Sequence, residues 1–443
     1  MKYYIIAGEA SGDLHGGNLM EGIYDKDPEA RIRFWGGDSM NEVFLRRHSS
    51  GQNCGLVRHY REGAVMGIAD VFAKARKLLT NLRYCKKDIL DFAPDCVILI
   101  DYPGFNFRIA EFAHKKGLKV IYYIAPKVWA SREGRIRKLK KYVDRLYIIF
   151  PFEIPYFESK GVKFVYKGNP LVDAVDKSVA ATECRRDFFK RCGLDDKPVI
   201  ALLAGSRKGE ISTMMPVLME LADRLHAIAD YSDWQFLVAG APGRDMDDYS
   251  PYLGGRKYVK LLFGETQSII KNAEAAVVNS GTASLETALL GTPQVVGFIF
   301  GSSLTFAIAK KIVKVKYISL GNLILNKLAF RELLQKECNA EELCLEVRRL
   351  IEDSRYRQAM IEDYSLIREK LVSSGTSSAV ATDLINYISG QAEESIFPFP
   401  KYRRANSHYV GTHFHCNAVV PRHPERQEIE IGRNVRAKSA QRL

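Results

Sequence analysis

Polar residues that could do chemistry follow three of the apolar runs in this sequence. The runs lie at 96–100, 199–203 and 275–278, and the residues that follow them are Asp101, Ala204 to Arg207, and Asn279 to Glu286. If the runs are parallel strands, these residues lie at the carboxyl edge of their sheets, where open α/β sheets bind ligands. Asp101 then places a carboxylate at that edge, and the Arg207 guanidinium could bind a diphosphate bidentately.

The third stretch indicates a phosphate site. Ser280, Gly281 and Thr282 are expected at a helix N-terminus, where backbone N–H groups and the positive end of the helix dipole favour a phosphate. Glu286 follows about one turn later and could accept hydrogen bonds from ribose hydroxyls. The alternative is that Thr282 and Glu286 are ordinary capping and surface residues. A neighbouring Arg207 favours a grip on a nucleoside diphosphate.

The stretch GEASGD at 8–13 follows the apolar run 3–7 and precedes a predicted helix. Such a turn often holds a phosphate or a sugar, but the dinucleotide fingerprint GxGxxG is absent. Glu9 and Asp13 would repel a pyrophosphate, so we interpret the turn as the wall of a sugar or acceptor site. The alternative is that the acids simply cap the helix, with Asp13 at its start.

The order of the elements predicts an α/β protein with two doubly wound, Rossmann-like halves. Expected strands lie at 3–7, 96–100, 120–124, 145–150 and 162–166, and then at 199–203, 235–239, 258–263, 275–278 and 294–299. We expect an N-terminal domain at 1–172, a linker with a helix at 173–197, and a C-terminal domain with terminal helices at 198–389. Residues 390–443 show no periodicity and are expected to be a disordered extension.

Composition and charge favour a globular protein without membrane spans. The 443 residues are 47% hydrophobic and 26% charged, with a net charge of +13, which suits a globular protein with an anionic partner. No nucleic-acid-binding motif is present, so nucleic acid is not expected. There is no apolar run of membrane-spanning length and no leader-like start, which predicts a cytoplasmic location. Eight cysteines without a CxxC pair predict reduced thiols and no structural zinc.

Five motifs in order resemble one known family. The motifs IAGEASGDLHG, IDYPGFN, APKVWASREGR, LLAGSR and NSGTASLE are similar, in order and approximate spacing, to those of lipid-A-disaccharide synthases, and the resemblance covers about residues 1–389. It implies a GT-B fold of two Rossmann-like domains and a glycosyltransferase that needs no metal or other cofactor. The implied reaction transfers 2,3-diacylglucosamine from UDP-2,3-diacylglucosamine to 2,3-diacylglucosamine 1-phosphate. It forms a β-1′,6 bond, releases UDP and takes place on the inner face of the inner membrane.

The resemblance also implies roles for individual residues. Asp101 matches the catalytic base and Glu9 an important active-site acid. Donor binding is assigned to Ser206, Arg207, Ser280, Gly281, Thr282, Glu286 and Asn322, and acceptor binding to Ser11, Asp13, His15, Arg132 and Arg135. Many members have Asp where this chain has Gly104, so no second carboxylate role transfers there. The tail after 389 has no counterpart in the family. Its four histidines could bind a metal, but a disordered appendage or an altered reading frame is the favoured interpretation.

A peripheral contact with the membrane is expected from residues 68–83. Apolar residues at helical spacing, including Ile68, Val71 and Phe72, lie largely apart from Lys74, Arg76, Lys77 and Arg83, as in a basic interfacial helix. A helix that faces the core is the alternative. The sequence also permits a homodimer.

Two other functions remain open. One is a UDP-N-acetylglucosamine 2-epimerase, which can share this two-domain nucleotide grip. The other is a basic protein that binds a membrane surface or nucleic acid without catalysis.

Overall fold

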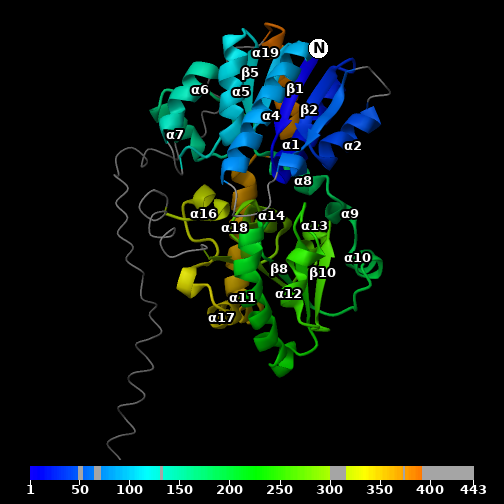
Figure 1. The fold of residues 1–443 in the computed structure, drawn as a ribbon. Helices are drawn as coiled ribbons and strands as arrows, with labels where there is room; N and C mark the ends of the chain where they lie inside the picture. The colour runs from blue at the N-terminus through cyan, green and yellow to red at the C-terminus, as the bar shows by residue number, and fades with distance from the viewer. Residues whose placement is uncertain (48–52, 64–70, 130–132, 300–315, 373–374, 392–443) are drawn as a thin grey trace, which may run out of the picture. The chain divides into compact units, whose positions relative to one another are not determined.

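Residues 1–47, 53–63, 71–129, 133–299, 316–372 and 375–391 are described by the computed structural model, except for the side chains of 71–75. Two parallel sheets organise them (Figure 1). The two doubly wound, Rossmann-like halves expected from the sequence are therefore confirmed.

The first sheet has seven parallel strands in the order β3-β2-β1-β4-β5-β6-β7. Their bounds are β1 Lys2–Ala7, β2 Arg31–Gly36, β3 Gly55–His59, β4 Cys96–Ile100, β5 Lys119–Tyr123, β6 Arg145–Ile148 and β7 Val165–Tyr166. Alternate residues of β1 and β4 enter two different apolar clusters, so both faces of the sheet are covered. Continuous apolar runs form these central strands because neither face meets water.

Helices cover both faces of the first sheet. They are α1 Ala10–Lys26, α2 Asp38–Arg47, α3 Tyr60–Gly63, α4 Val71–Phe92, α5 Pro103–Lys115, α6 Ile136–Tyr142, α7 Glu153–Ser159 and α8 Pro170–Asp176. Apolar residues of α1, α2 and α8 pack on one face, and those of α4, α5, α6 and α7 pack on the other. The helix α1 begins at Ala10, with Glu9 as its N-cap, so most of the predicted turn at 8–13 is already helical.

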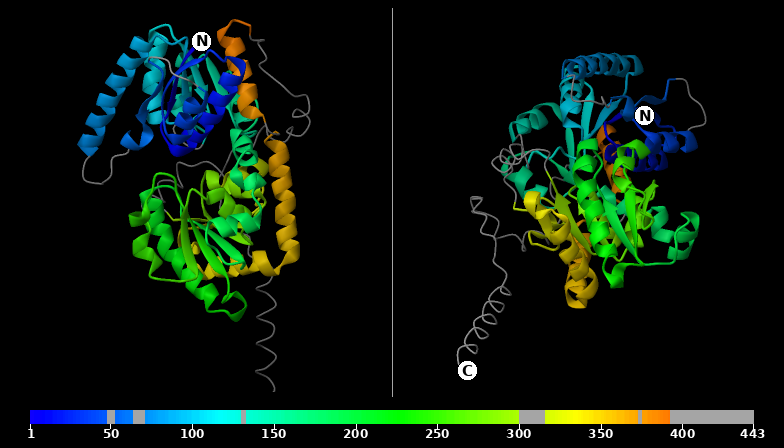
Figure 2. Two further views of the ribbon diagram at one scale, coloured as in Figure 1. Left: turned by 90° about the vertical axis from the view of Figure 1, so that its right-hand side faces the viewer. Right: turned by 60° about the horizontal axis from the view of Figure 1, so that its bottom comes forward.

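The second sheet has six parallel strands in the order β10-β9-β8-β11-β12-β13. Their bounds are β8 Val199–Leu203, β9 Gln235–Gly240, β10 Val259–Phe263, β11 Ala275–Asn279, β12 Gln294–Phe298 and β13 Glu332–Leu334. The helices of this part are α9 Val179–Thr182, α10 Arg185–Arg191, α11 Lys208–His226, α12 Ser250–Leu253, α13 Thr266–Lys271, α14 Thr282–Leu290, α16 Leu320–Leu325, α17 Ala340–Glu352 and α18 Ser354–Lys370. Figure 2 shows α18 running alongside this sheet.

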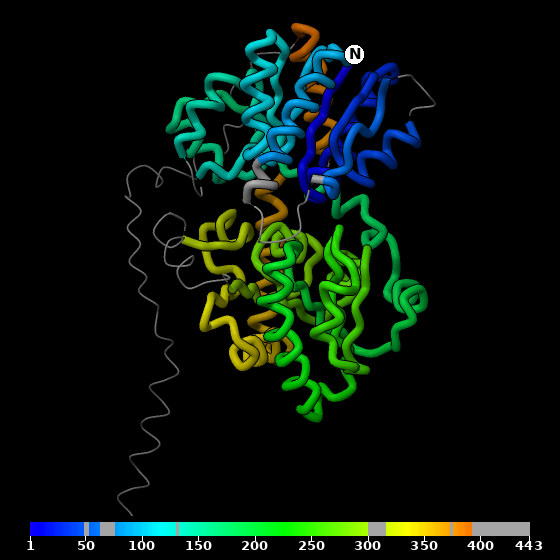
Figure 3. The backbone as a smooth tube through the Cα atoms, viewed as in Figure 1, coloured from blue at the N-terminus to red at the C-terminus, as the bar shows by residue number. Residues whose placement is uncertain are grey.

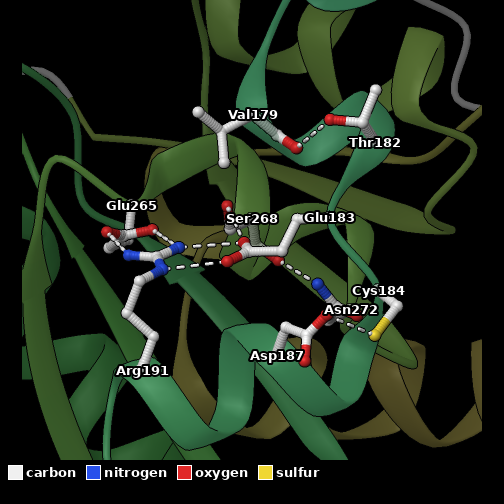
Figure 4. Close-up of polar contacts among 9 residues, drawn as sticks. All are labelled: Val179, Thr182, Glu183, Cys184, Asp187, Arg191, Glu265, Ser268 and Asn272. Atoms are coloured by element: carbon white, nitrogen blue, oxygen red, sulfur yellow. Dashed lines mark hydrogen bonds and ion pairs between the residues drawn. The ribbon is translucent and has the colours of Figure 1, made fainter.

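The segment expected to be a linker is fastened to the second sheet. Phe188 and Phe189 of α10 are buried against β8, β9 and β11. Arg191 forms ion pairs with both Glu183 and Glu265, and Ser268 of α13 also donates to Glu183 (Figure 4). These contacts leave the segment from α9 onward little freedom of its own.

The last helix among the described residues, α19 Thr376–Ile388, returns to the first sheet (Figure 3). Asp383 accepts two hydrogen bonds from Arg145 of β6, at 2.7 and 2.8 Å, and a third from the Tyr147 hydroxyl. At the start of α19, the Asp173 carboxylate of α8 accepts from the backbone N–H groups of Gly375, Thr376 and Ser377. The helix α19 therefore joins α1 in the layer that covers one face of the first sheet.

Candidate active site

Three neighbouring strands of the first sheet end beside one another. Ile100 of β4 lies between Ala7 of β1 and Tyr123 of β5 in the strand register. The residues that follow these ends include Glu9 after β1, Asp101 after β4 and Lys127 after β5. The edge of the sheet thus carries two carboxylates and an ammonium group, as the parallel topology requires.

Asp101 and its neighbour have a strained backbone. Their φ values of 41° and 45° place Asp101 and Tyr102 in the left-handed region of backbone conformation. Residues other than Gly, Asn and Asp seldom adopt this region. The carbonyl of Asp101 accepts hydrogen bonds from the Asn106 amide at 2.8 Å and from the Tyr122 hydroxyl at 2.6 Å. Such strain persists where surrounding contacts hold it, and it is concentrated at functional sites.

The pKa of Asp101 is raised because the carboxyl group loses part of its contact with water. The positive charge of Lys127 opposes this rise in pKa, and the negative charge of Glu9 adds to it. The positive charge of Arg207 also opposes the rise, but more weakly. A half-buried carboxylate of raised basicity, with cations nearby that favour its ionised form, is suited to accept a proton from a hydroxyl group.

Gly8 is required by the packing at this edge. A Cβ at Gly8 would lie 2.3 Å from the ring of Tyr102, which stacks on Phe105 with ring centroids 5.6 Å apart. The Tyr102 ring thus lies directly over the end of β1. This contact connects the GEASGD stretch with the strained peptide at Asp101.

Asp13, expected at the acceptor site, makes its hydrogen bonds within the protein. Its buried carboxylate accepts hydrogen bonds from the backbone N–H groups of Gly37, Ser39 and Met40, at 2.6 to 3.2 Å. Asp13 therefore holds the turn between β2 and α2, and it does not cap α1.

The other expected acceptor residues differ in exposure. His15 is buried, and burial lowers its pKa to about 4, so its imidazole is neutral near pH 7. Ser11 is exposed, and Arg135 is half-buried with its guanidinium over the Phe107 ring. Arg132 lies outside the described residues.

Arg207 connects the two sheets. It is the N-cap of α11, after β8, and its guanidinium lies 3.6 Å from the Glu9 carboxylate and 3.1 Å from that of Glu210. The backbone N–H groups of Ser206 and Arg207 both donate to Glu210. The start of α11 is thus already capped, whereas the Arg207 side chain remains largely exposed and can contact an anion.

The N-terminus of α14 lies beyond β11, the neighbour of β8. Gly281 is its N-cap and makes no side-chain cap, while the N–H group of Ser280 donates to the carbonyl of Gly297. The first N–H groups of the helix therefore lack intrahelical partners, as at any helix start. Glu286 lies one turn on; its carboxylate accepts a 2.6 Å hydrogen bond from Gln267, and burial raises its pKa.

Asn322, expected near the donor, is fully buried and is used within the protein. Its amide nitrogen donates to the Phe330 carbonyl and to Glu332, and its amide oxygen accepts from the N–H groups of Ala329 and Phe330. Asn322 thus fixes the turn between α16 and β13 through these four hydrogen bonds.

Two residues of this region, Lys127 and Glu153, were missed from the sequence. Lys127 was visible within APKVWASREGR, but only the strand order shows that it neighbours Asp101. Glu153 is buried with a pKa raised to about 7, and it accepts hydrogen bonds from the Trp129 indole and from the N–H groups of Ile149 and Phe150. No local sequence pattern indicates that Glu153 is buried or which groups it binds.

The structure does not test the residues expected to contact the membrane. Ile68 lies outside the described residues, as does the tail from 392, and the side chains of Val71 and Phe72 are not described. Further along α4, Leu82 is buried in the core and Leu79 is exposed. Among the described helices, none is long and apolar enough to cross a membrane. The described residues also hold no cluster of His, Cys, Asp or Glu that could bind a metal.

Solved structures with this architecture include UDP-N-acetylglucosamine 2-epimerases. The enzyme from Neisseria meningitidis, bound to UDP-GlcNAc, aligns with a TM-score of 0.62 over 87% of this chain and 100% of its own, at 12% identity. The S. aureus MnaA–UDP structure aligns with a TM-score of 0.60 over 88% and 97%, at 14% identity. At these identities the likeness shows the fold alone, which is GT-B-like.

Sequence comparison identifies the family. A lipid-A-disaccharide synthetase family model matches residues 3–382. Lipid-A-disaccharide synthase from Syntrophus aciditrophicus is 37% identical over 386 residues, which are 87% of this chain and 97% of that protein. The enzyme of the same name from Trichlorobacter lovleyi is 35% identical over 382 residues, 86% and 96% of the two chains. The chain therefore belongs to the lipid-A-disaccharide synthase family of glycosyltransferases.

Proposed function

We propose that this enzyme transfers 2,3-diacylglucosamine from UDP-2,3-diacylglucosamine to the 6-hydroxyl of 2,3-diacylglucosamine 1-phosphate, with inversion and release of UDP. Family membership over residues 3–382 is the observation that carries the proposal. The grouping of Glu9, Asp101 and Lys127 at one sheet edge, with Arg207 against Glu9, supports it. We propose residues 1–172 as the acceptor domain, which α19 completes, the rest of 198–389 as the donor domain, and 173–197 as their connection.

In this mechanism Asp101 removes the proton of the acceptor hydroxyl as its oxygen attacks the anomeric carbon. An inverting transfer needs one base on the face opposite the leaving group. The bond from the anomeric carbon to the UDP oxygen breaks, and its electron pair leaves with the diphosphate. Arg207 and the N-terminus of α14 stabilise the charge that develops on that diphosphate.

The remaining roles follow from charge and exposure. Glu9 orients Arg207 through their 3.6 Å ion pair, and Ser11 and Arg135 contact the acceptor. Ser206 and Thr282, both exposed, contact the donor phosphates, and the Glu286 carboxylate accepts from a ribose hydroxyl beside Gln267. We keep Arg132 as an acceptor residue of the same proposal.

Release of UDP tests the function directly. The purified enzyme is given UDP-2,3-diacylglucosamine alone, the acyl-sugar phosphate alone, and both together, and UDP and the disaccharide are quantified. We expect both products, in equal amounts, only when both substrates are present. UDP release that does not depend on the acceptor contradicts the proposal. In a separate incubation with UDP-N-acetylglucosamine, conversion of that compound to its manno epimer would also contradict it.

We also propose that the enzyme works at the inner face of the inner membrane, because both substrates carry acyl chains. Ile68, Val71 and Phe72 are the residues proposed to insert. Ile68→Ser with Phe72→Ser should reduce sedimentation with anionic vesicles and raise KM for acylated substrates without lowering thermal stability. Loss of stability in place of loss of binding would identify the stripe as part of the core.

A further inference from the structure

Asn279, the last residue of β11, has an unusual environment. Its side chain is 4% exposed, and neither its amide nitrogen nor its amide oxygen has a hydrogen-bond partner. Of the buried side chains in the part of the chain that the structure describes, it is the one with both polar atoms unpaired. Buried polar groups are normally paired, so an orphaned amide requires an explanation.

The amide lies between two turns that end neighbouring strands. Asn279 directly precedes Ser280 and the start of α14, and β11 pairs with β8 along its length. A Cβ at Gly205, in the turn between β8 and α11, would lie 2.3 Å from the Asn279 amide nitrogen. Gly205 has a φ of 105°, so the turn both requires glycine and leaves room for the amide.

The surroundings of the amide favour an anionic ligand that also carries hydroxyl groups. At the α11 turn the N–H groups are taken by Glu210, so they do not satisfy Asn279. On the other side, the N-terminus of α14 has no side-chain cap and favours negative charge. An amide donates through nitrogen and accepts through oxygen, so a ligand that satisfies both atoms must offer an acceptor and a donor.

We propose that Asn279 is a binding residue for the nucleotide-sugar donor. Its amide nitrogen donates to a phosphate oxygen, and its amide oxygen accepts from a hydroxyl group of the same ligand. The inference rests on the proposed function and adds to it a residue from the strand end, beside the helix N-terminus. In the ligand-free protein the unpaired amide lowers stability, and binding of the donor restores the missing hydrogen bonds.

The test compares stability with affinity in three variants. Asn279→Ala removes the amide, Asn279→Asp replaces it with a carboxylate of the same shape, and Asn272→Ala is the matched control. The Asn272 amide donates to the Ser268 carbonyl at 2.8 Å and thus has the protein partner that Asn279 lacks (Figure 4). UDP affinity is measured by titration calorimetry, and the midpoint of thermal unfolding is measured without ligand.

For Asn279→Ala we expect the dissociation constant for UDP to rise about tenfold, with an unfolding midpoint equal to or above that of the wild type. Asn279→Asp should weaken UDP binding more, about a hundredfold, because its charge repels the diphosphate. Asn272→Ala should lower the midpoint and leave UDP affinity unchanged.

Two results would overturn the inference while leaving the proposed function intact. One is UDP affinity within twofold of the wild type in Asn279→Ala. The other is a fall in the unfolding midpoint like that of Asn272→Ala without loss of affinity, which would show a structural amide. A wild-type enzyme that does not bind UDP at all would overturn the donor class, and with it both proposals.

Discussion

Replacing Asp101 with asparagine separates its basicity from its conformation. Asparagine is among the few residues that tolerate a φ near 41°, so Asp101→Asn should keep the strained turn that an alanine would disturb. The carbonyl of residue 101, which accepts from Asn106 and Tyr122, is unchanged. The change therefore removes a proton acceptor and little else.

The expected loss in kcat is about 10² to 10⁴, or about 3 to 5 kcal/mol of transition-state stabilisation, the usual contribution of a general base. UDP affinity should change little. Because burial raises the pKa of Asp101, wild-type kcat/KM should fall as the pH is lowered through a value above the ordinary 3.8. The pH profile of Asp101→Asn should lack this fall at low pH.

Stability gives an independent check with a defined sign. A carboxyl group whose pKa is raised by folding stabilises the folded state below its ordinary pKa, and this contribution is lost as the pH rises through the raised pKa. At pH 7 the ionised Asp101 is therefore a net cost, and Asp101→Asn should be at least as stable as the wild type. The two proteins should converge in stability at low pH.

Initial rates of UDP release across pH, titration calorimetry with UDP and urea unfolding together test this reasoning. Near-normal turnover in Asp101→Asn would show that another group takes the proton, and Glu9 would be the first to examine. Joint loss of turnover and UDP affinity would instead place Asp101 in donor binding.

Three further changes have defined outcomes. Gly8→Ala places a methyl group 2.3 Å from the Tyr102 ring, so turnover should fall by about 10²-fold with an unchanged circular dichroism spectrum; normal turnover would show that the ring is free to move. Asp383→Ala leaves the Arg145 guanidinium without its partner, so urea unfolding should show a free energy of unfolding lower by about 3 to 5 kcal/mol. A loss under about 1 kcal/mol would show that the ion pair contributes no more than one at the surface. Truncation after Ser389 removes only residues beyond the family match and should preserve kcat/KM; a loss above about tenfold would give the tail a function.

The sequence predicted the wholly apolar central strands well and missed three strands outside them. The expected strands at 96–100 and 199–203 match β4 and β8, because both faces of these strands are buried and their sequences are wholly apolar. The strands β2, β3 and β13 were missed. Arg31 and Arg33 break the apolar pattern of β2, although Arg33 is paired with Asp88 of α4, which no local pattern could reveal.

The site was predictable where topology alone places a residue. Glu9, Asp101 and Arg207 follow strands, so parallel pairing brings them to the same edges. The internal hydrogen bonds of Asn322 could not be predicted, because they depend on the turn at 329–330, which is set by tertiary contacts. The importance of Asn279 was equally invisible, because a missing hydrogen bond has no sequence signature.

The return of α19 to the first sheet has a consequence for how the protein is made. Arg145 and Asp383 are 238 residues apart, so the ribosome must synthesise the whole second sheet before the two can meet. Until then the apolar surface of α1 that Val380, Ala381 and Leu384 help to bury remains exposed on the nascent chain. The N-terminal half therefore cannot complete its folding during its own translation, and a chaperone that shields apolar surface would have the most to do in that interval.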